Sequence, residues 1–138
     1  MELLCDANIV LDVFLKREPF YAASTQVLHM CEAGDINGFI PVSTLTDVYY
    51  IIRRATSSKD KAFTAISSIT NILKPCSVTD EDLSLAIAAH GIDFEDNLIE
   101  ACAIRNNFDY ILTRNEKHFG ELGISAVTPE KILNMYML

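Results

Sequence analysis

The stretch Leu3-Leu4-Cys5-Asp6-Ala7-Asn8-Ile9-Val10-Leu11-Asp12 decides the fold class. An apolar run ends at an acid, as a short buried strand does, and residues 8–15 then carry the apolar residues of a mostly buried helix. A strand that leads directly into a helix is the first half of a βαβ unit, in which the two strands lie parallel. The stretch therefore predicts an α/β protein with a parallel sheet.

Short apolar runs and helical patterns alternate along the rest of the chain. Further strands are expected at residues 38–42, 76–78, 109–113 and 125–127. Further helices are expected at residues 19–33, 43–54, 63–73, 80–90, 94–107 and from 129 onward, with apolar residues such as Phe63, Leu83 and Ile87 marking helical spacing. The pattern predicts a three-layer α/β/α sandwich with a central parallel sheet of four to five strands. Residues 1–138 are expected to form a single domain, because no repeat or linker interrupts them.

Composition limits the class of protein. Half of the 138 residues are hydrophobic, yet no run approaches the roughly 20 apolar residues of a membrane helix. The N-terminus lacks the basic and long apolar regions of a secretory signal, so we expect no cleaved leader. Four separated cysteines without a C-x-x-C pair are expected to be buried free thiols, although two disulfides are the alternative. These features predict a soluble cytoplasmic protein without a membrane partner.

A net charge of −8 argues against a broad basic face for nucleic acid. It leaves nucleic acid open as a substrate, because divalent cations bound by clustered acids can meet the phosphate. The three histidines share no zinc-ligand spacing, and neither a nucleophile triad nor a glycine-rich phosphate loop is present in the sequence. The chemistry must therefore come from the acids.

Polar residues follow the ends of three predicted strands: Asp6 and Asn8, then Ser43 and Asp47, then Thr113, Arg114 and Asn115. The helix that leads into the fourth strand begins with Asp93, Glu95 and Asp96, so its start lies at the same edge of the sheet. Ligands of open parallel sheets bind outside the carboxyl ends of the strands. These segments are therefore expected to converge on one site.

Each acid also has a structural explanation. Asp6 and Asp93 can cap the helices that follow them, Asp96 can stabilise the first turn, and Thr44-x-x-Asp47 fits a capping box. Several carboxylates at one edge, however, repel one another and lose hydration, and a hard cation bound through oxygen ligands offsets this. The cluster predicts an Mg²⁺ or Mn²⁺ site, and such a cation suits phosphodiester hydrolysis.

Five segments taken in order resemble the PIN-domain (PilT N-terminus) family over nearly the whole chain. They are residues 4–12, residues 16–20, residues 43–52, residues 93–97 and the strand exit Thr113-Arg114-Asn115. The resemblance implies a parallel-sheet α/β/α fold and an Mg²⁺- or Mn²⁺-dependent ribonuclease that acts on RNA, with the toxins of toxin-antitoxin pairs among its relatives.

The resemblance also implies roles for individual residues. Asp6 and Asp96 would be metal-binding catalytic acids, supported by hydrogen bonds from Asn8 and Ser43. Asp47 would be a third catalytic and metal-binding acid, in a place where the family commonly has the longer Glu.

Further residues are expected around this set. Asn115 stands where many members carry another Asp, and it offers an oxygen without a charge. Asp93 is expected to support the site and ranks above Glu95, which should point about 100° away from Asp96 on a helix. Arg114 is expected to contact a substrate phosphate, with the acid cluster or bulk water as alternatives.

Two other classes of protein compete with the ribonuclease. A PIN-like module that binds nucleic acid or a partner without efficient catalysis is supported by the departures at Asp47 and Asn115. A receiver-like signalling domain also groups acids at strand ends, but Val78-Thr79 and Val127-Thr128 lack its phosphoacceptor Asp and its Lys.

Expected partners follow from the leading interpretation. They are the RNA substrate, a possible antitoxin and a second copy of the chain in a homodimer. Arg53-Arg54 is expected to be a solvated helix end, and Tyr49 and Tyr50 are expected to pack in the core or a dimer rather than against bases.

Overall fold

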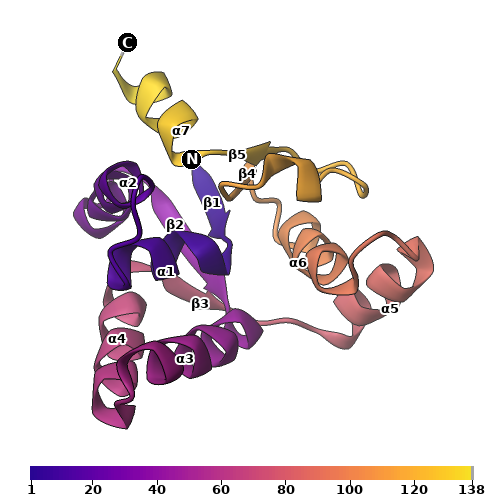
Figure 1. Ribbon diagram of the computed structural model, residues 1–138. Helices are drawn as coiled ribbons and strands as arrows, with labels where there is room; N and C mark the ends of the chain where they lie inside the picture. Colours follow the sequence, from indigo (N-terminus) through magenta and orange to yellow (C-terminus); the bar gives the residue numbers. More distant parts are fainter. Residues whose placement is uncertain (138) are drawn as a thin grey trace.

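A computed structural model describes residues 1–137 and has one parallel five-stranded sheet at its centre (Figure 1). The sheet order is β3-β2-β1-β4-β5, and every neighbouring pair is parallel. The strands are β1 (Glu2–Cys5), β2 (Asn37–Pro41), β3 (Lys74–Cys76), β4 (Tyr110–Leu112) and β5 (Ala126–Val127). The predicted parallel sheet of four to five strands is confirmed.

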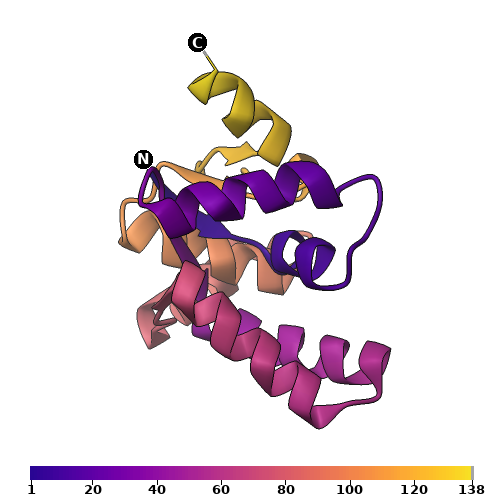
Figure 2. The same cartoon turned by 90° about the vertical axis from the view of Figure 1, so that its left-hand side faces the viewer.

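Seven α-helices surround the sheet: α1 (Ala7–Phe14), α2 (Tyr21–Ala33), α3 (Val42–Thr56), α4 (Lys59–Ile72), α5 (Asp80–Ala89), α6 (Phe94–Arg105) and α7 (Pro129–Tyr136). A short 3₁₀ turn, η1 (Glu116–His118), follows β4. Figure 1 shows α1 and α2 on one side of the sheet and α6 with α5 on the other, and Figure 2 shows α3 and α4 as an antiparallel pair beside this body. The predicted three-layer α/β/α sandwich is confirmed.

No helix within residues 1–137 combines the length and apolar character of a membrane span.

Alternating side chains on the strands build two separate cores. Leu3 and Cys5 of β1 face the core that contains α1 to α4 and α7, whereas Leu4 faces the core that contains α6. In β4, Leu112 faces the first core and Ile111 the second. Successive strand residues point to opposite faces, so the uninterrupted apolar run at the N-terminus is what a strand buried on both sides requires.

Some residues with helical spacing do not face a core. Phe63, Leu83 and Ile87 are 58%, 42% and 61% exposed. The buried residues of α4 are Ala62, Ala65 and Ile69, and α5 packs mainly on α6, where a small residue, Ala86, lies at the contact. The helices were predicted correctly. The same spacing also included the buried Ile69, Leu73 and Ala86, but it did not separate them from the exposed residues.

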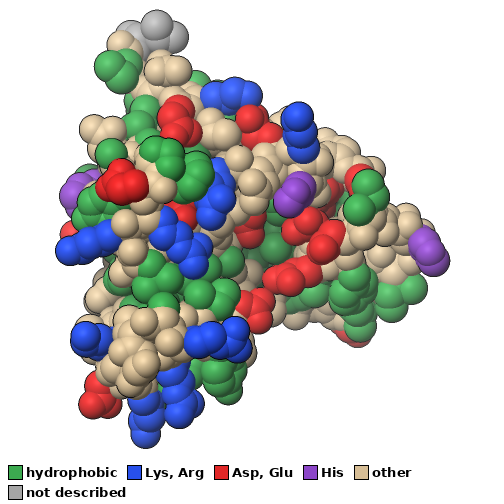
Figure 3. Space-filling view, viewed as in Figure 1, with side chains coloured by type: hydrophobic (Ala, Val, Ile, Leu, Met, Phe, Trp, Pro, Cys, Tyr) green, Lys and Arg blue, Asp and Glu red, His purple; other side chains and the backbone are tan. Residues whose placement is uncertain are grey.

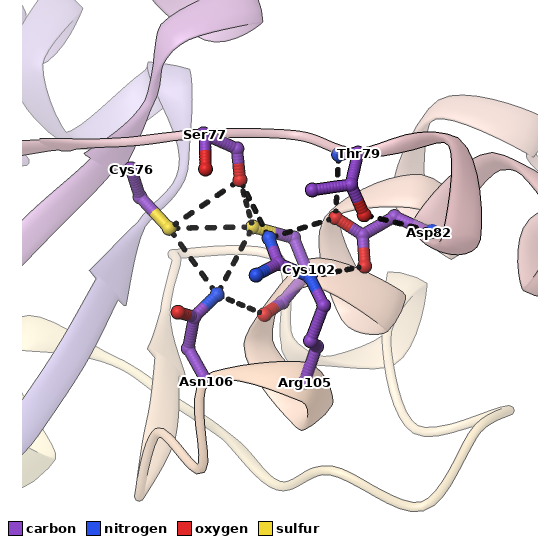
Figure 4. Close-up of polar contacts among 7 residues, drawn as sticks. All are labelled: Cys76, Ser77, Thr79, Asp82, Cys102, Arg105 and Asn106. Carbon is purple, nitrogen blue, oxygen red and sulfur yellow. Dashed lines mark hydrogen bonds and ion pairs between the residues drawn. The ribbon is translucent and has the colours of Figure 1, made fainter.

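A buried polar cluster ties β3 to α5 and α6 (Figure 4). Arg105 of α6 donates from Nε and Nη2 to the Asp82 carboxylate at 2.9 and 3.0 Å, and Nη2 also donates to the Ser77 carbonyl at 2.7 Å. The Sγ atoms of Cys76 and Cys102 lie 3.5 Å apart, and burial raises the pKa of Cys102 to about 12. All four cysteines are buried and free, as predicted. This cluster fixes the position of α6, whose first turn carries the predicted acids.

Candidate functional site

The predicted acids gather beside β1, at the point where the chain stops adding strands on one side of β1 and begins to add them on the other. β1 pairs with β4, although the chain between them passes through β2 and β3 on the other side. Asp6 and Thr113 leave the carboxyl ends of these two strands, and the Thr113 hydroxyl donates to Oδ2 of Asp6 at 2.9 Å. A reversal of this kind opens a crevice at the sheet edge, which is the usual ligand site of open α/β sheets.

Asp6 has one of the two roles expected for it, the cap of α1, and its role in metal binding stays a prediction. Its Oδ1 accepts the N–H of Ala7 at 2.8 Å at the start of α1, so it caps that helix. Burial raises the pKa of Asp6, although the hydrogen bonds from Thr113 and Ala7 act in the opposite direction. With Asn8, three donors hold the Asp6 carboxylate in one orientation, and a partly desolvated carboxylate held in this way is preorganised to bind a cation.

Asn8 supports Asp6, as predicted, and leaves one oxygen unused. Its Nδ2 donates to Oδ2 of Asp6 at 3.2 Å and lies 3.5 Å from the Thr113 hydroxyl. Its Oδ1 is buried and has no hydrogen-bond partner among residues 1–137. A buried, unpaired carbonyl oxygen is unfavourable by about 1–3 kcal/mol, and carbonyl oxygens are ligands of hard cations. This atom therefore fits a site that receives a cation.

The first turn of α6 supplies the second acid of the site. Asp93 caps α6 by accepting the Asp96 N–H at 2.9 Å, which confirms the cap predicted for it. Burial raises the pKa of Asp96 to about 6, and the negative charges of Asp93 and Asp6 add to this rise. The charge of Asp6 thus acts on Asp96 across the gap between β1 and α6. Figure 3 shows red acidic side chains in a band over this part of the surface.

Asp47 and Ser43 lie on exposed positions of α3. Asp47 lies beside Glu95. Burial of Glu95 and the neighbouring Asp47 carboxylate together raise the pKa of Glu95 to about 7. The acids that act most on Asp96 are instead Asp93 and Asp6. Asp93 acts on both Asp96 and Glu95, so the acids form one continuous group that runs from Asp6 through the first turn of α6 to Asp47. The capping box proposed for Asp47 is wrong, because α3 begins at Val42 and has Pro41 as its N-cap.

The remaining predicted residues, Arg114 and Asn115, lie just after the end of β4. Arg114 donates from Nε to Oδ2 of Asp12 at 2.8 Å, and its guanidinium lies over the Phe20 ring at 4.3 Å. Asp12 is completely buried, so this pair anchors the strand exit to α1. A contact between Arg114 and a substrate phosphate stays a prediction. Asn115 is half-buried, and its N–H donates to the Thr113 hydroxyl at 3.1 Å.

Two further residues of the site, His118 and Glu100, were not identified from the sequence, whereas Thr113 was named there only as part of the strand exit. Thr113 orients Asp6, and His118 of η1 lowers the pKa of both Asp6 and Asp96 by its positive charge. Glu100 is buried on α6 and accepts the N–H groups of Gly120 and Leu122 at 2.7 and 2.8 Å. It thereby fixes the loop that carries His118. A single His and an acid on an apolar helix face give no sequence signal for these roles.

A pocket of about 190 Å³ lies beside Asp96, and all but one of its six lining residues are charged or polar. The residues around it are Ile92, Asp93, Asp96, Lys117, His118 and Glu121. Within residues 1–137, no group of three or more His, Cys, Asp and Glu side chains is close enough together to hold a metal ion. Mg²⁺ retains several waters and uses one or two protein carboxylates. The carboxylates of Asp6 and Asp96 and the amide oxygen of Asn8 are oxygen donors of the kind that a hydrated Mg²⁺ or Mn²⁺ takes.

The raised pKa of Asp96 predicts how stability changes with pH when no metal is present. Its pKa is 3.8 ordinarily and about 6 in the folded protein, so the folded state binds this proton more tightly than the unfolded state. The resulting stabilisation is lost as pH rises through 6. We expect the melting temperature in excess EDTA to fall between pH 5 and pH 8, and to fall less in Asp96→Asn. An equal fall in both proteins would contradict the raised pKa.

Comparisons with known proteins identify the family of this chain. The family model of the PIN domain matches residues 2–117. Ribonuclease VapC1 of Aquifex aeolicus (strain VF5) is 25% identical over 135 residues, which are 94% of this chain and 92% of that protein.

Solved structures show the same fold. A chain of VapBC2 from Rickettsia felis, bound to a DNA fragment from its promoter, superposes with a TM-score of 0.69 at 15% identity, covering 93% of this chain and 98% of that chain. A chain of a toxin-antitoxin complex from Klebsiella pneumoniae gives 0.67 at 22% identity, covering 92% and 97%. Since the family model spans most of the sequence and the predicted segments are in their expected places, this chain belongs to the PIN-domain family.

Proposed function

We propose that this protein is a ribonuclease that hydrolyses RNA phosphodiester bonds with Mg²⁺ or Mn²⁺, and that it acts as the toxin of a toxin-antitoxin pair. The observation that carries the proposal is the pairing of Asp6 and Asp96 at the switch point of the sheet, with the unpaired Oδ1 of Asn8 beside them. The similarity to Ribonuclease VapC1 of Aquifex aeolicus supports RNA as the substrate.

The residues of this chain have distinct tasks in the proposed reaction. Asp6 and Asp96 supply the negative charge that holds the cation, and the Thr113 hydroxyl and the Ala7 N–H fix the direction of the Asp6 carboxylate. His118 lines the pocket beside Asp96, where its imidazole N–H would donate to a phosphate oxygen of the substrate. A bound divalent cation supplies charge stabilisation at the phosphoryl group and lowers the pKa of a water molecule.

Asp47 and Glu95 form an acidic pair at the border of the site. Because the pKa of Glu95 is raised to about 7, this side chain exchanges a proton near neutral pH. Asp47 is exposed, and we propose that it reaches the cation through water rather than directly. Ser43, one turn before Asp47 on α3, and Asn115 at the β4 exit are proposed to orient water or substrate by hydrogen bonds.

Partners of the protein are proposed on the same basis. The Klebsiella pneumoniae neighbour was solved in a toxin-antitoxin complex, which supports an antitoxin as the protein partner here. A homodimer is proposed because exposed large apolar side chains remain on the surface, including Ile87, Ile92 and Phe94. A cytoplasmic location is proposed from the four buried free cysteines.

A cleavage assay tests the proposed function. Purified protein is incubated with a panel of end-labelled RNAs in Mg²⁺, in Mn²⁺ or in excess EDTA. We expect cutting in both metals and none in EDTA, with activity restored when metal is added back in excess. Binding of RNA without cutting in either metal would instead favour a PIN-like binding module, which the exposed Asp47 and the uncharged Asn115 also allow.

A further inference from the structure

One face of α3 carries a row of exposed residues that runs from the candidate site to a basic depression near the C-terminal end of the helix. Ser43, Asp47, Tyr50, Arg54 and Ser57 follow one another at intervals of four, three, four and three residues, and all five are exposed. With 3.6 residues per turn, this spacing places them on one side of the helix and its C-cap. We call these five residues the α3 stripe.

The C-terminal end of the α3 stripe borders a depression in the surface, which we call the hollow. Tyr50, Arg53, Arg54 and Ser57 line a shallow depression of about 380 Å³. Six or seven residues of helix separate Asp47 from the two arginines, a rise of about 9–11 Å along the axis. At roughly 3.4 Å per stacked nucleotide, a strand that leaves the acids reaches the hollow after about three nucleotides.

Tyr50 has the exposure and support of a stacking platform. It is 56% exposed, and its ring meets Tyr49 edge-on at 5.1 Å between centroids. Tyr49 in turn packs against Phe63 of α4 at 5.1 Å. Tyr50 was expected to pack in the core or in a dimer; the structure excludes the core, because more than half of the residue's surface is exposed within this chain. A fixed, exposed aromatic ring can stack against a base of any sequence.

The charge around the hollow is opposite to that of the protein as a whole. The net charge is −8, yet Arg53, Arg54, Lys59 and Lys61 lie within nine residues that contain one acid, Asp60. None of the ion pairs formed within residues 1–137 involves Arg53 or Arg54. Figure 3 shows blue side chains at the far end of the α3 and α4 pair, away from the red band. Two free guanidinium groups beside an aromatic ring are suited to phosphates and bases.

We propose that the α3 stripe is the path of the single-stranded RNA that flanks the cleaved bond, with a base stacked on Tyr50 and phosphates bound by Arg53 and Arg54. The inference rests on the proposed ribonuclease function and adds where the substrate lies and how long it must be. A substrate that reaches the hollow gains these contacts, whereas one that ends within about two nucleotides of the cut does not. Continuity with the acids favours RNA over a protein segment at this face.

The test compares variants of the hollow with charge-matched variants elsewhere. Arg53→Gln/Arg54→Gln and Tyr50→Ala change the hollow, and Lys74→Gln/Lys131→Gln removes the same charge from β3 and α7. Affinity for a single-stranded 12-nucleotide RNA of mixed sequence is measured by fluorescence anisotropy in EDTA at several salt concentrations. Cleavage of this RNA and of a dinucleotide is measured in Mg²⁺.

We expect the arginine variant to bind the 12-nucleotide RNA roughly tenfold more weakly, with the slope of log Kd against log salt concentration reduced by about 1.4 for two lost phosphate contacts. Tyr50→Ala weakens binding by roughly tenfold without changing that slope. Cleavage of the 12-nucleotide RNA rises in KM with little change in kcat, and cleavage of the dinucleotide is unchanged. The Lys74 and Lys131 variant matches wild type in slope and KM.

Other outcomes separate this inference from the proposed function. If wild type binds and cuts RNA but the hollow variants keep its affinity and salt slope, the path along α3 is wrong and the ribonuclease assignment stands. If the same variants instead lose self-association in light scattering, or binding to a co-expressed antitoxin, the face belongs to a protein and the path is wrong. If wild type neither binds nor cuts RNA, both proposals fail together.

Discussion

Replacing Asp6 or Asp96 by Asn is expected to slow RNA cleavage by roughly 100- to 1,000-fold. Each change keeps the shape of the side chain and removes one of the two charges that would hold the cation. Metal ions contribute several kcal/mol of charge stabilisation in such reactions, and each 1.36 kcal/mol corresponds to tenfold in rate. The rates are measured under single-turnover conditions at an Mg²⁺ concentration that saturates wild type.

A matched variant separates charge at the site from charge in general. Asp35→Asn makes the same chemical change at an exposed position after α2 and should cut at the wild-type rate. Asp96→Asn should also raise the melting temperature in EDTA at pH 8, because it removes a partly buried charge that Asp93 and Asp6 repel. A variant that is more stable and inactive has lost a functional group rather than its fold. Wild-type cleavage by both Asp6→Asn and Asp96→Asn would disprove their assignment.

The second large effect is on stability. Arg114→Leu is expected to lower the free energy of unfolding by about 3 kcal/mol, since it leaves the buried Asp12 carboxylate without its closest partner. Arg17, whose Nη1 lies 3.9 Å from Asp12, compensates only in part. The loss is measured by urea unfolding, with the midpoint and slope fitted separately.

A double-mutant cycle isolates the contribution of this pair. Asp12→Asn combined with Arg114→Leu should lose less stability than the sum of the two single changes, because the second change no longer leaves a charge unpaired. Additive losses would mean that Arg114 and Asp12 act independently. A loss for Arg114→Leu within about 0.5 kcal/mol of wild type, the range of ordinary surface changes, would show that the pair does not anchor the β4 exit.

The sequence predicted the layers of this fold because local patterns and global topology agree. The run from Leu3 to Cys5 must be buried on both faces, and Thr128-Pro129 carries a cap and a first-turn proline at the exact start of α7. Spacing failed at Phe63, Leu83 and Ile87, where a small residue on an adjacent face of the helix forms the contact instead. Which face is buried depends on the neighbouring helix, and that information is not local.

The sequence predicted which acids of the candidate site lie at one edge of the sheet, but not the contacts that their side chains make. Asp6 and Asp96 could be placed at one edge, because parallel strands bring their carboxyl ends together. The partnership of Asp47 with Glu95 and of Arg114 with Asp12 depends on side-chain directions that strand order does not determine. His118 reaches the site only because Glu100 binds the loop after it, which no spacing in the sequence reveals.

The most direct test of the central claim is the position of the metal itself. Crystals of the wild-type protein are soaked in Mn²⁺, and anomalous difference maps are calculated near the manganese absorption edge. We predict one strong peak in the gap between the Asp6 and Asp96 carboxylates, within ligand distance of Oδ1 of Asn8, and no peak there in Asp6→Asn. A peak bound by other residues, or none at a Mn²⁺ concentration that supports cleavage, would contradict the account.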